Sequence, residues 1–579
     1  MKKIKLLTFI SIVFVFCSCD DLIEPAIENN RGLKDMYAEA EYAQGILLNA
    51  YTRLPGNSWS FNDVATDDAV TNDINSNYLK VATGQWTANF NPLDQWTNSK
   101  SAIQYLNIFL AEADKVKWAK DDNVSVLFRN RLKGEAYGLR ALYMYYLLQA
   151  HAGVASNGEL LGVPVLLEPQ TSTSNFNVGR SSFEDCMKQL YADVAKAVEL
   201  LPLDFEDAAT LPPGYDNLAD YNRVFGQYAR QRMSSRIAQV VRAQAALLAA
   251  SPAFSSGSTT AWESAAKYAG ELLNLNGGIA GIDPNGLNWY NNAAELSSLG
   301  GGVNPKEVIW RSDIAESNAL ESDNFPPTLF GKGRVNPTQN LVDAFPMANG
   351  YPIANPASNY NAANPYANRD PRLQKFILVN QATAGVNNTV ITTASDGSTN
   401  DALNKVGTST RTGYYMKKLL RQDVNLNPNA VNNQRHYKPR MRYTELYLIY
   451  AEAANEAWGP LASGSAGFSA YDVIQALRKR AGISQPDLYL ESIKSDQSAM
   501  RNLIRNERRL ELCFEGFRFW DLRRWNLNLT SAAEGMKIQG GAYQKITVEN
   551  RLFQEYMNYG PIPYSEVLKF NALIQNKGW

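Results

Sequence analysis

The most informative stretch of the chain lies near its C-terminus, where residues 507–525 read ERRLELCFEGFRFWDLRRW. Apolar side chains recur at helical spacing through 499–514, which predicts one apolar helix face. Glu507, Glu511 and Glu515 follow one another at intervals of four on this helix, so their carboxylates would repel. Arginines nearby can neutralise them, and bidentate pairs would lock the helix against its neighbours. These arginines are Arg505, Arg508, Arg509, Arg518 and Arg523.

The same glutamates could instead form a catalytic pair, because glycosidases use two carboxyl groups about 5 to 10 Å apart. A general acid needs a raised pKa, whereas adjacent arginines keep carboxylates ionised. The sequence therefore favours a structural role for this helix, and we predict no catalytic residue.

Composition excludes several functional classes. The chain has 579 residues, 45% of them hydrophobic, and its 56 Lys and Arg balance 57 Asp and Glu. This is a globular composition without the positive field that attracts nucleic acid, so we expect no nucleic-acid partner. Only two histidines occur, and two of the four cysteines lie in the first twenty residues. A Cys/His metal site or a nucleophilic triad is therefore not expected, and no cofactor is predicted. Oxygen-rich loops such as 62–75 leave a structural calcium ion open.

The N-terminus has the pattern of an export signal. Lysines at positions 2, 3 and 5 precede an apolar run, 6–16, that is too short for an ordinary transmembrane helix. A small residue, Ser18, stands directly before Cys19, as at the cleavage site of bacterial lipoprotein signals. We therefore predict a signal peptide over 1–18 and lipidation of Cys19; an ordinary secretory signal with incidental cysteines is the alternative.

Helical periodicity dominates the segment 19–274 outside an aromatic loop at 57–96. Stacked antiparallel helix pairs are the simplest way to bury so many one-faced helices in series. No strict 34-residue repeat is present, so spacing alone gives little support for tetratricopeptide repeats. Across the chain, the predicted helices are 33–53, 98–116, 124–151, 183–200, 224–250, 260–274, 442–458 and 469–481.

Residues 275–440 differ in composition from the helical parts. Asn, Pro, Gly, Thr and Ser increase, and the apolar runs are short, as at 307–310 and 376–379. Loops of this length are either functional or disordered, and the embedded Trp and Tyr argue against disorder. We predict a loop-rich, ligand-binding subdomain inserted into a mainly α scaffold. Residues 441–579 would add a helical pair and a signature helix at 499–525, packed as one body with the rest.

The stretch 507–525 resembles the signature helix of the SusD/RagB family of outer-membrane nutrient-binding lipoproteins. Further family-like segments follow the chain order over nearly the whole mature sequence: RLKGEAYGLRALY at 131–143, GVPV at 162–165, PTQNLVDAF at 337–345, RDPRL at 369–373, RYTELYLIYAEA at 442–453, IP at 562–563 and QNKGW at 575–579. The resemblance implies tetratricopeptide-like helix pairs that support an irregular ligand-binding part.

The resemblance also implies a function. Such proteins capture oligosaccharides, or peptides in the RagB branch, and pass them to a SusC-like TonB-dependent transporter. Asp20 and Asp21 after Cys19 resemble a surface-export signal, which implies a lipid-anchored protein on the outer face of the outer membrane. The expected function is thus glycan capture without catalysis. A peptide binder, a surface glycoside hydrolase recruiting Asp67, Asp68 or Asp323, and a protein-interaction scaffold remain as alternatives.

Sugar binding requires flat aromatic rings for the C–H faces of pyranoses and polar side chains for the hydroxyls. Two segments, 57–96 and 287–330, combine both. For each ring, packing beneath its own loop is the alternative use. No family motif assigns ligand-binding residues here, so the predicted set depends on the residues alone: Trp59, Tyr78, Trp86, Trp289, Tyr290 and Phe325 as stacking rings, with Asp67 and Asn288 as polar partners.

Overall fold

The structure is a computed structural model that describes residues 37–255, 258–527 and 529–579. The predicted signal peptide and Cys19 lie outside these residues. No helix in the described ranges combines the length and apolar character needed to cross a membrane. The α-helices are α2 (Ala40–Tyr51), α3 (Asn77–Ala82), α4 (Trp96–Glu112), α5 (Asp122–His151), α6 (Phe183–Leu200), α7 (Leu218–Phe225), α8 (Ser235–Ala250), α9 (Thr259–Leu275), α10 (Ala293–Ser298), α11 (Ala319–Asn324), α12 (Gln339–Ala344), α13 (Pro371–Phe376), α14 (Tyr443–Trp458), α15 (Ala470–Ala481), α16 (Leu488–Ile493), α17 (Gln497–Glu511), α18 (Arg518–Arg524) and α19 (Tyr564–Lys569).

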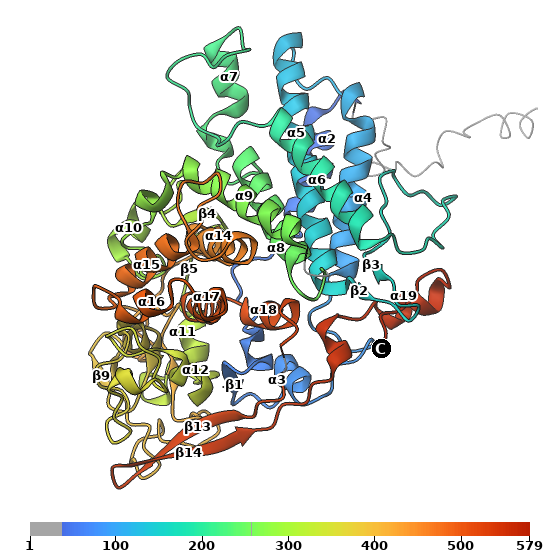
Figure 1. Ribbon diagram of the computed structural model, residues 1–579. Coiled ribbons are helices and arrows are strands. Elements are labelled where there is room, and N and C mark those ends of the chain that lie inside the picture. Colours follow the sequence, from blue (N-terminus) through green and yellow to red (C-terminus); the bar gives the residue numbers. More distant parts are fainter. Residues whose placement is uncertain (1–36, 256–257, 528) are drawn as a thin grey trace, which may run out of the picture.

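The long helices form one packed array. Each of α4, α5, α6, α8, α9 and α14 packs against the next, with α2 against α4 and α17 against α14 (Figure 1). Side-chain caps define several starts: Ser182 accepts a hydrogen bond from the Asp185 amide at α6, and Ser469 forms a capping box with Asp472 at α15. Because the array buries one contiguous core, the mainly α scaffold of helix pairs is confirmed.

The prediction of a helix over 224–250 is wrong in its first third. The chain forms α7, which ends at Phe225, and α8 begins only at Ser235. Gly226 interrupts the helix, and the Ser234 hydroxyl accepts a hydrogen bond from the Ile237 amide to start the next one. The periodicity of apolar residues continued through this break, so it did not mark the boundary.

Residues 276–442 hold only short elements, and no helix there is longer than six residues. Strands from this segment pair with distant parts of the chain in two-stranded antiparallel sheets: β1 with β6, β12 with β4 and β11 with β5. The strands are β1 (Ala69–Thr71), β2 (Gly153–Val154), β3 (Leu160–Leu161), β4 (Val308–Arg311), β5 (Ala315–Ser317), β6 (Val335–Pro337), β7 (Ile377–Leu378), β8 (Thr383–Ala384), β9 (Thr389–Val390), β10 (Tyr415–Met416), β11 (Gln434–His436), β12 (Pro439–Arg442), β13 (Ala533–Gln539) and β14 (Ala542–Glu549).

The predicted signature helix over 499–525 is two helices, which corrects that expectation. Helix α17 ends at Glu511, and α18 begins at Arg518. Between them Phe514 and Gly516 adopt left-handed backbone angles, with φ of 64° and 87°. A helix cannot continue through such residues. The turn exposes backbone groups that, as described below, hold the loop around Trp59.

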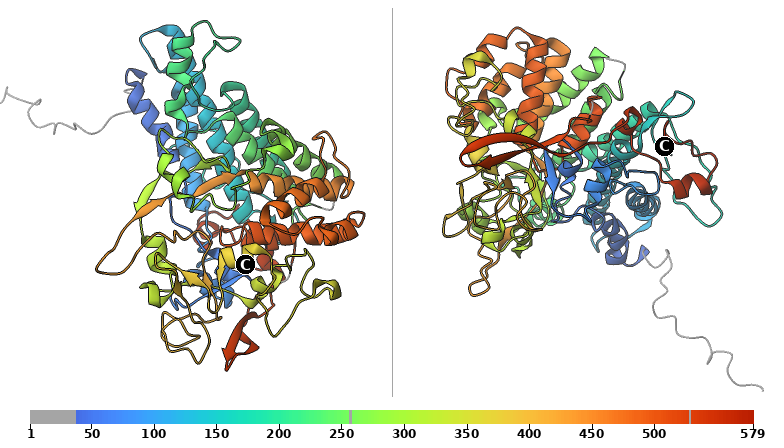
Figure 2. Two further views of the ribbon diagram at one scale, coloured as in Figure 1. Left: turned by 90° about the vertical axis from the view of Figure 1, so that its left-hand side faces the viewer. Right: turned by 90° about the horizontal axis from the view of Figure 1, so that it is seen from below.

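A long hairpin near the C-terminus had no counterpart in the predictions. Strands β13 and β14 pair in antiparallel fashion around Gly540 and Gly541, which both have positive φ. The hairpin runs across the face seen from below (Figure 2), and the Met536 amide donates to the Thr412 carbonyl of the loop-rich segment. The hairpin therefore ties the end of the chain to this segment.

Candidate functional site

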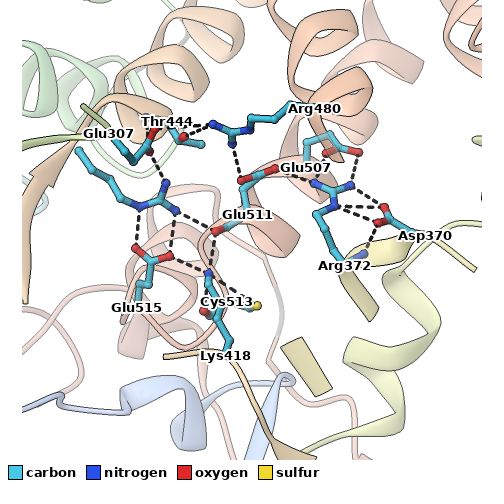
Figure 3. Close-up of polar contacts among 11 residues, drawn as sticks. Glu307, Asp370, Arg372, Lys418, Thr444, Arg480, Glu507, Glu511, Cys513 and Glu515 are labelled. Carbon is cyan, nitrogen blue, oxygen red and sulfur yellow. Dashed lines mark hydrogen bonds and ion pairs between the residues drawn. The ribbon is translucent and has the colours of Figure 1, made fainter. Parts of the chain in front are cut away.

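A buried ion network surrounds the signature glutamates (Figure 3). We use this name for the cations Arg372, Lys418, Arg442, Arg478 and Arg480 with the carboxylates of Glu307, Asp370, Asp487, Glu507, Glu511 and Glu515. Arg372 is fully buried, and its guanidinium lies 2.6 Å from Asp370, 2.8 Å from Glu507 and 2.9 Å from Glu511. On the other side of the network, Arg442 and Lys418 both bind Glu515, at 2.8 and 2.7 Å.

The electrostatics of this network fit a structural role. Burial alone would raise the pKa of Glu507, but Arg372 and Arg478 hold it below its ordinary value. Burial acts in the same way on the pKa of Glu511, which Arg480 and Arg372 lower. Both carboxylates are therefore ionised and enclosed, and neither can serve as a general acid.

The signature turn positions the loop that carries Trp59. The Phe514 amide donates to the Asp63 carboxyl at 3.2 Å, and the Asn62 side-chain amide donates to the Gly516 carbonyl at 3.2 Å. Two ion pairs continue this contact: Arg518 binds Asp67 at 2.9 Å, and Arg509 binds Asp68 at 2.6 Å. Loop 57–68 is thus fastened to α17 and α18 over a sequence separation of more than 440 residues.

The two predicted aromatic segments meet at a cleft of about 350 Å3, which we call the Trp59 cleft. Loop 57–61 forms one wall, α11 with Arg334 forms another, and the end of β11 closes the site. Its lining residues are Asn57, Ser58, Trp59, Phe61, Ala315, Ser317, Ala319, Leu320, Asp323, Asn324, Arg334, His436 and Tyr437.

Trp59 is half-buried and lies above a packed aromatic floor. Its ring centroid is 6.3 Å from that of Trp289, which in turn contacts Tyr290 and Tyr437. The Tyr437 hydroxyl donates to the Trp289 carbonyl at 2.8 Å, which fixes this floor. A ring with a rigid base and a solvent-accessible part can contact the apolar face of a sugar.

Phe61 supports the same wall from a strained position. Its φ of 47° and ψ of 39° are left-handed, which is rare for an aromatic residue. Such strain persists only where surrounding contacts enforce it, and it is concentrated at functional sites. Here the enforcing contacts are those of Asn62 and Asp63 with the signature turn.

The structure places the predicted site residues differently from our expectation. Trp59 lines the cleft, while Tyr78 and Asn288 are half-buried and do not line it. Asp67 is engaged by Arg518 and Arg509, which hold its pKa well below the ordinary value although burial would raise it. Asp67 is therefore a structural anion rather than a rim group.

Four predicted stacking rings are enclosed, which corrects their assignment. A flat face that is covered by protein cannot stack on a ligand. Trp86 packs edge-on against Phe519 and Trp579, with the Arg523 guanidinium 5.0 Å from its ring. Trp289, Tyr290 and Phe325 fill the core beneath the loop-rich segment. Their exposed fractions are 3% for Trp86, 2% for Trp289, 6% for Tyr290 and 1% for Phe325.

Sequence reasoning missed several lining residues. His436 and Tyr437 reach the cleft because β11 pairs with β5, with Arg435 opposite Glu316. Arg334 arrives through the segment that leads into β6. None of these residues lies in a recognisable motif; the only sequence signal for His436 and Tyr437 is the alternation of polar and apolar residues in 434–442, and Arg334 has none.

A larger cavity of about 530 Å3 lies between α4, α5, α19 and the loop 163–178. Aliphatic side chains such as Ile103, Leu147 and Leu166 dominate its wall. Its buried charges are already paired, because Arg140 binds Asp193 at 2.6 Å. Polar residues such as Gln104, Gln170 and Gln189 also line this cavity, but unlike the Trp59 cleft it has no tryptophan in its lining.

Comparisons with known proteins agree with this architecture. A family model described as "SusD family" matches residues 306–579, and one described as "Starch-binding associating with outer membrane" matches residues 31–224. Two SusD-like proteins of Formosa agariphila are 36% identical over 101 residues and 27% identical over 245 residues. These matches cover 17% and 38% of this chain, and only 19% and 40% of the lengths of those relatives.

The fold is shared with solved structures. A SusD-like carbohydrate-binding protein from Bacteroides fragilis NCTC 9343 superimposes with a TM-score of 0.68 at 22% identity. The alignment covers 93% of this chain and 99% of that chain. The two family models, the ordered signature segments and this full-length likeness agree, and the chain belongs to the SusD/RagB family.

Proposed function

We propose that this protein captures oligosaccharides in the Trp59 cleft without altering them and delivers them to a SusC-like TonB-dependent transporter. In this proposal the chain is held on the outer face of the outer membrane by lipid on Cys19. The observation that carries it is a partly exposed Trp59 ring, fixed on a rigid aromatic floor and surrounded by polar side chains. The descriptions of the matched family model and of the Bacteroides fragilis protein support carbohydrate as the ligand class.

The glycoside hydrolase alternative has little support at this site. Asp68 is fully buried against Arg509, and Asp67 is paired with Arg518, so neither faces the cleft. Asp323 does line it but is paired with Lys332 at 2.8 Å. A glycosidase needs two carboxyl groups facing each other across the substrate, and one exposed carboxylate does not provide them.

Replacing Trp59 by Ala tests the proposal. We expect affinity for a bound glycan to fall about 5- to 150-fold, since a stacked aromatic anchor contributes about 1 to 3 kcal/mol. Isothermal titration against a panel of oligosaccharides and oligopeptides gives the measurement. Tyr564→Ala removes an exposed aromatic ring on α19 and serves as the matched control.

Three results would contradict the proposal. Unchanged glycan affinity in Trp59→Ala would remove the cleft as the site. Preferential binding of oligopeptides would favour the RagB-like alternative. Release of shortened glycans during prolonged incubation, detected by chromatography, would show catalysis.

A further inference from the structure

Cations without carboxylate partners gather beside the Trp59 cleft. The Lys438 ammonium lies 5.1 Å from the Trp59 ring centroid and donates to the Ser58 carbonyl at 3.0 Å. Among the described residues, no Asp or Glu oxygen comes within ion-pair distance of it. Lys438 is half-buried and does not itself line the cleft, but its ammonium lies against the Trp59 ring, which does.

Two arginines behind Lys438 are also bonded to neutral groups. Arg440 donates to the carbonyls of Arg311 and Pro55, and Arg311 donates to the carbonyls of Ser312 and Val303. The Nε atom of each is buried and has no hydrogen-bond partner. Carbonyl groups satisfy donors but cancel no charge, so this cluster keeps its positive charge next to Ser58, Trp59 and Tyr437, which line the cleft.

The acidic groups nearby balance this charge only in part. Asp323 is paired with Lys332, and Arg334, the cation that lines the cleft, forms a long ion pair of 3.9 Å with Asp73, without a hydrogen bond between them. Exposed Asp313 is the acidic neighbour of Arg311 and Arg440. Burial, with a further contribution from Arg440, lowers the pKa of Lys438 to about 8. A bound anion would offset the free-energy cost of burying the charged Lys438 ammonium.

Resting on the proposed function, we propose that the Trp59 cleft selects acidic oligosaccharides, whose carboxylate or sulfate groups pair with Lys438 and Arg334. The sugar ring would contact Trp59, and its acidic substituent would replace water around these two cations. Uronates and sulfate esters present the same chemistry to them: an anion with several acceptor oxygens.

Paired polysaccharides test this inference. Affinity electrophoresis would compare polygalacturonate with its methyl ester and carrageenan with its desulfated form, alongside starch and laminarin. We expect retention by at least one acidic polysaccharide and weaker retention by its neutral partner. The uronate and sulfate pairs distinguish the two sources of charge, and the retention should decrease as sodium chloride is added.

Charge variants identify the residues responsible. Lys438→Gln keeps a donor for the Ser58 carbonyl and should weaken the retained acidic ligand about tenfold, the size of one charge-assisted hydrogen bond. Arg334→Gln should act in the same direction. Lys196→Gln removes an exposed lysine of α6 and should change nothing. Circular dichroism checks that each variant is folded.

The outcomes separate this inference from the proposed function. Retention by neutral glycans alone, lost in Trp59→Ala, would overturn the acidic selectivity and leave glycan capture intact. Equal retention of acidic glycans by wild type, Lys438→Gln and Arg334→Gln would also overturn it. No retention by any glycan would contradict both proposals.

Discussion

Charged side chains have different partners in the buried ion network and beside the Trp59 cleft. In the network, arginines such as Arg372 and Arg478 are enclosed and face carboxylates at hydrogen-bond distance. Beside the cleft, Lys438 and Arg440 face backbone carbonyls, and Trp59 is partly exposed to solvent. Paired, buried charges hold one rigid geometry. Charges without carboxylate partners can still form ion pairs with a bound ligand. The most recognisable residues therefore build the support, and unremarkable residues form the candidate site.

The largest expected effect comes from breaking the network. Arg372→Met would leave Asp370, Glu507 and Glu511 buried with fewer cations, at a cost of about 3 to 5 kcal/mol in the free energy of unfolding. Urea denaturation measures this change. Glycan affinity of the folded variant should be retained, because loop 57–68 is held by Arg509 and Arg518 instead.

A surface pair provides the control for that experiment. Arg129 lies 3.5 Å from Asp114 on the exposed side of α5. Arg129→Met should cost less than about 1 kcal/mol. Similar stability losses in both variants would contradict the distinction between the buried network and surface ion pairs.

The second prediction concerns Asp63, which joins loop 57–68 to the turn between α17 and α18. Burial, with repulsion from Asp68, raises the pKa of Asp63 from 3.8 to about 7. The native state therefore holds a proton that the unfolded chain releases, so this group destabilises the protein as pH rises from about 4 to about 7. Asp63→Asn mimics the protonated form and should therefore raise the free energy of unfolding above pH 7 by on the order of 4 kcal/mol.

Unfolding experiments at several pH values check this sign. The stability advantage of Asp63→Asn over wild type should be small near pH 4, grow as the pH approaches about 7, and then remain constant. An advantage that shrinks with rising pH would show that Asp63 is ionised in the native state. Asp114→Asn, at an exposed position, is the matched control.

The smallest predicted effect sharpens the description of the cleft floor. Tyr437→Phe removes the hydrogen bond to the Trp289 carbonyl and should cost about 1 kcal/mol in stability. Because Trp59 rests on Trp289, we also expect a modest loss of glycan affinity, below that of Trp59→Ala. Affinity reduced as strongly as in Trp59→Ala would indicate that Tyr437 contacts the ligand directly.

Helices with a strong apolar period were predictable from local sequence. The predicted ranges 183–200, 442–458 and 469–481 agree with α6, α14 and α15 to within one residue at each end. The break between α17 and α18 was not predicted, because φ values such as that of Phe514 are enforced by tertiary contacts. The β13–β14 hairpin was also missed, although Gly540 and Gly541 were a local signal for its turn.

The candidate site was predictable only in part. Trp59 lies in a loop rich in aromatic and polar residues, as predicted. The composition of this loop, however, could not distinguish Trp59 from Trp86, which the fold encloses. Burial depends on which distant segments cover a ring: Phe519 and Trp579 cover Trp86, while Trp59, packed on the Trp289 floor and next to Lys438, stays partly exposed. Whether Trp59 binds a glycan remains a prediction.

Two things followed from the sequence by itself: the helical scaffold, because amphipathic periodicity is local, and the family, because its signature segments are contiguous. Only the tertiary structure decided which rings are enclosed and which charges are paired. Those properties arise from contacts between residues more than a hundred positions apart, as when Arg509 meets Asp68 and His436 lies 3.4 Å from Glu321 of α11. No local pattern encodes such contacts, since packing selects them after the helices and strands have formed.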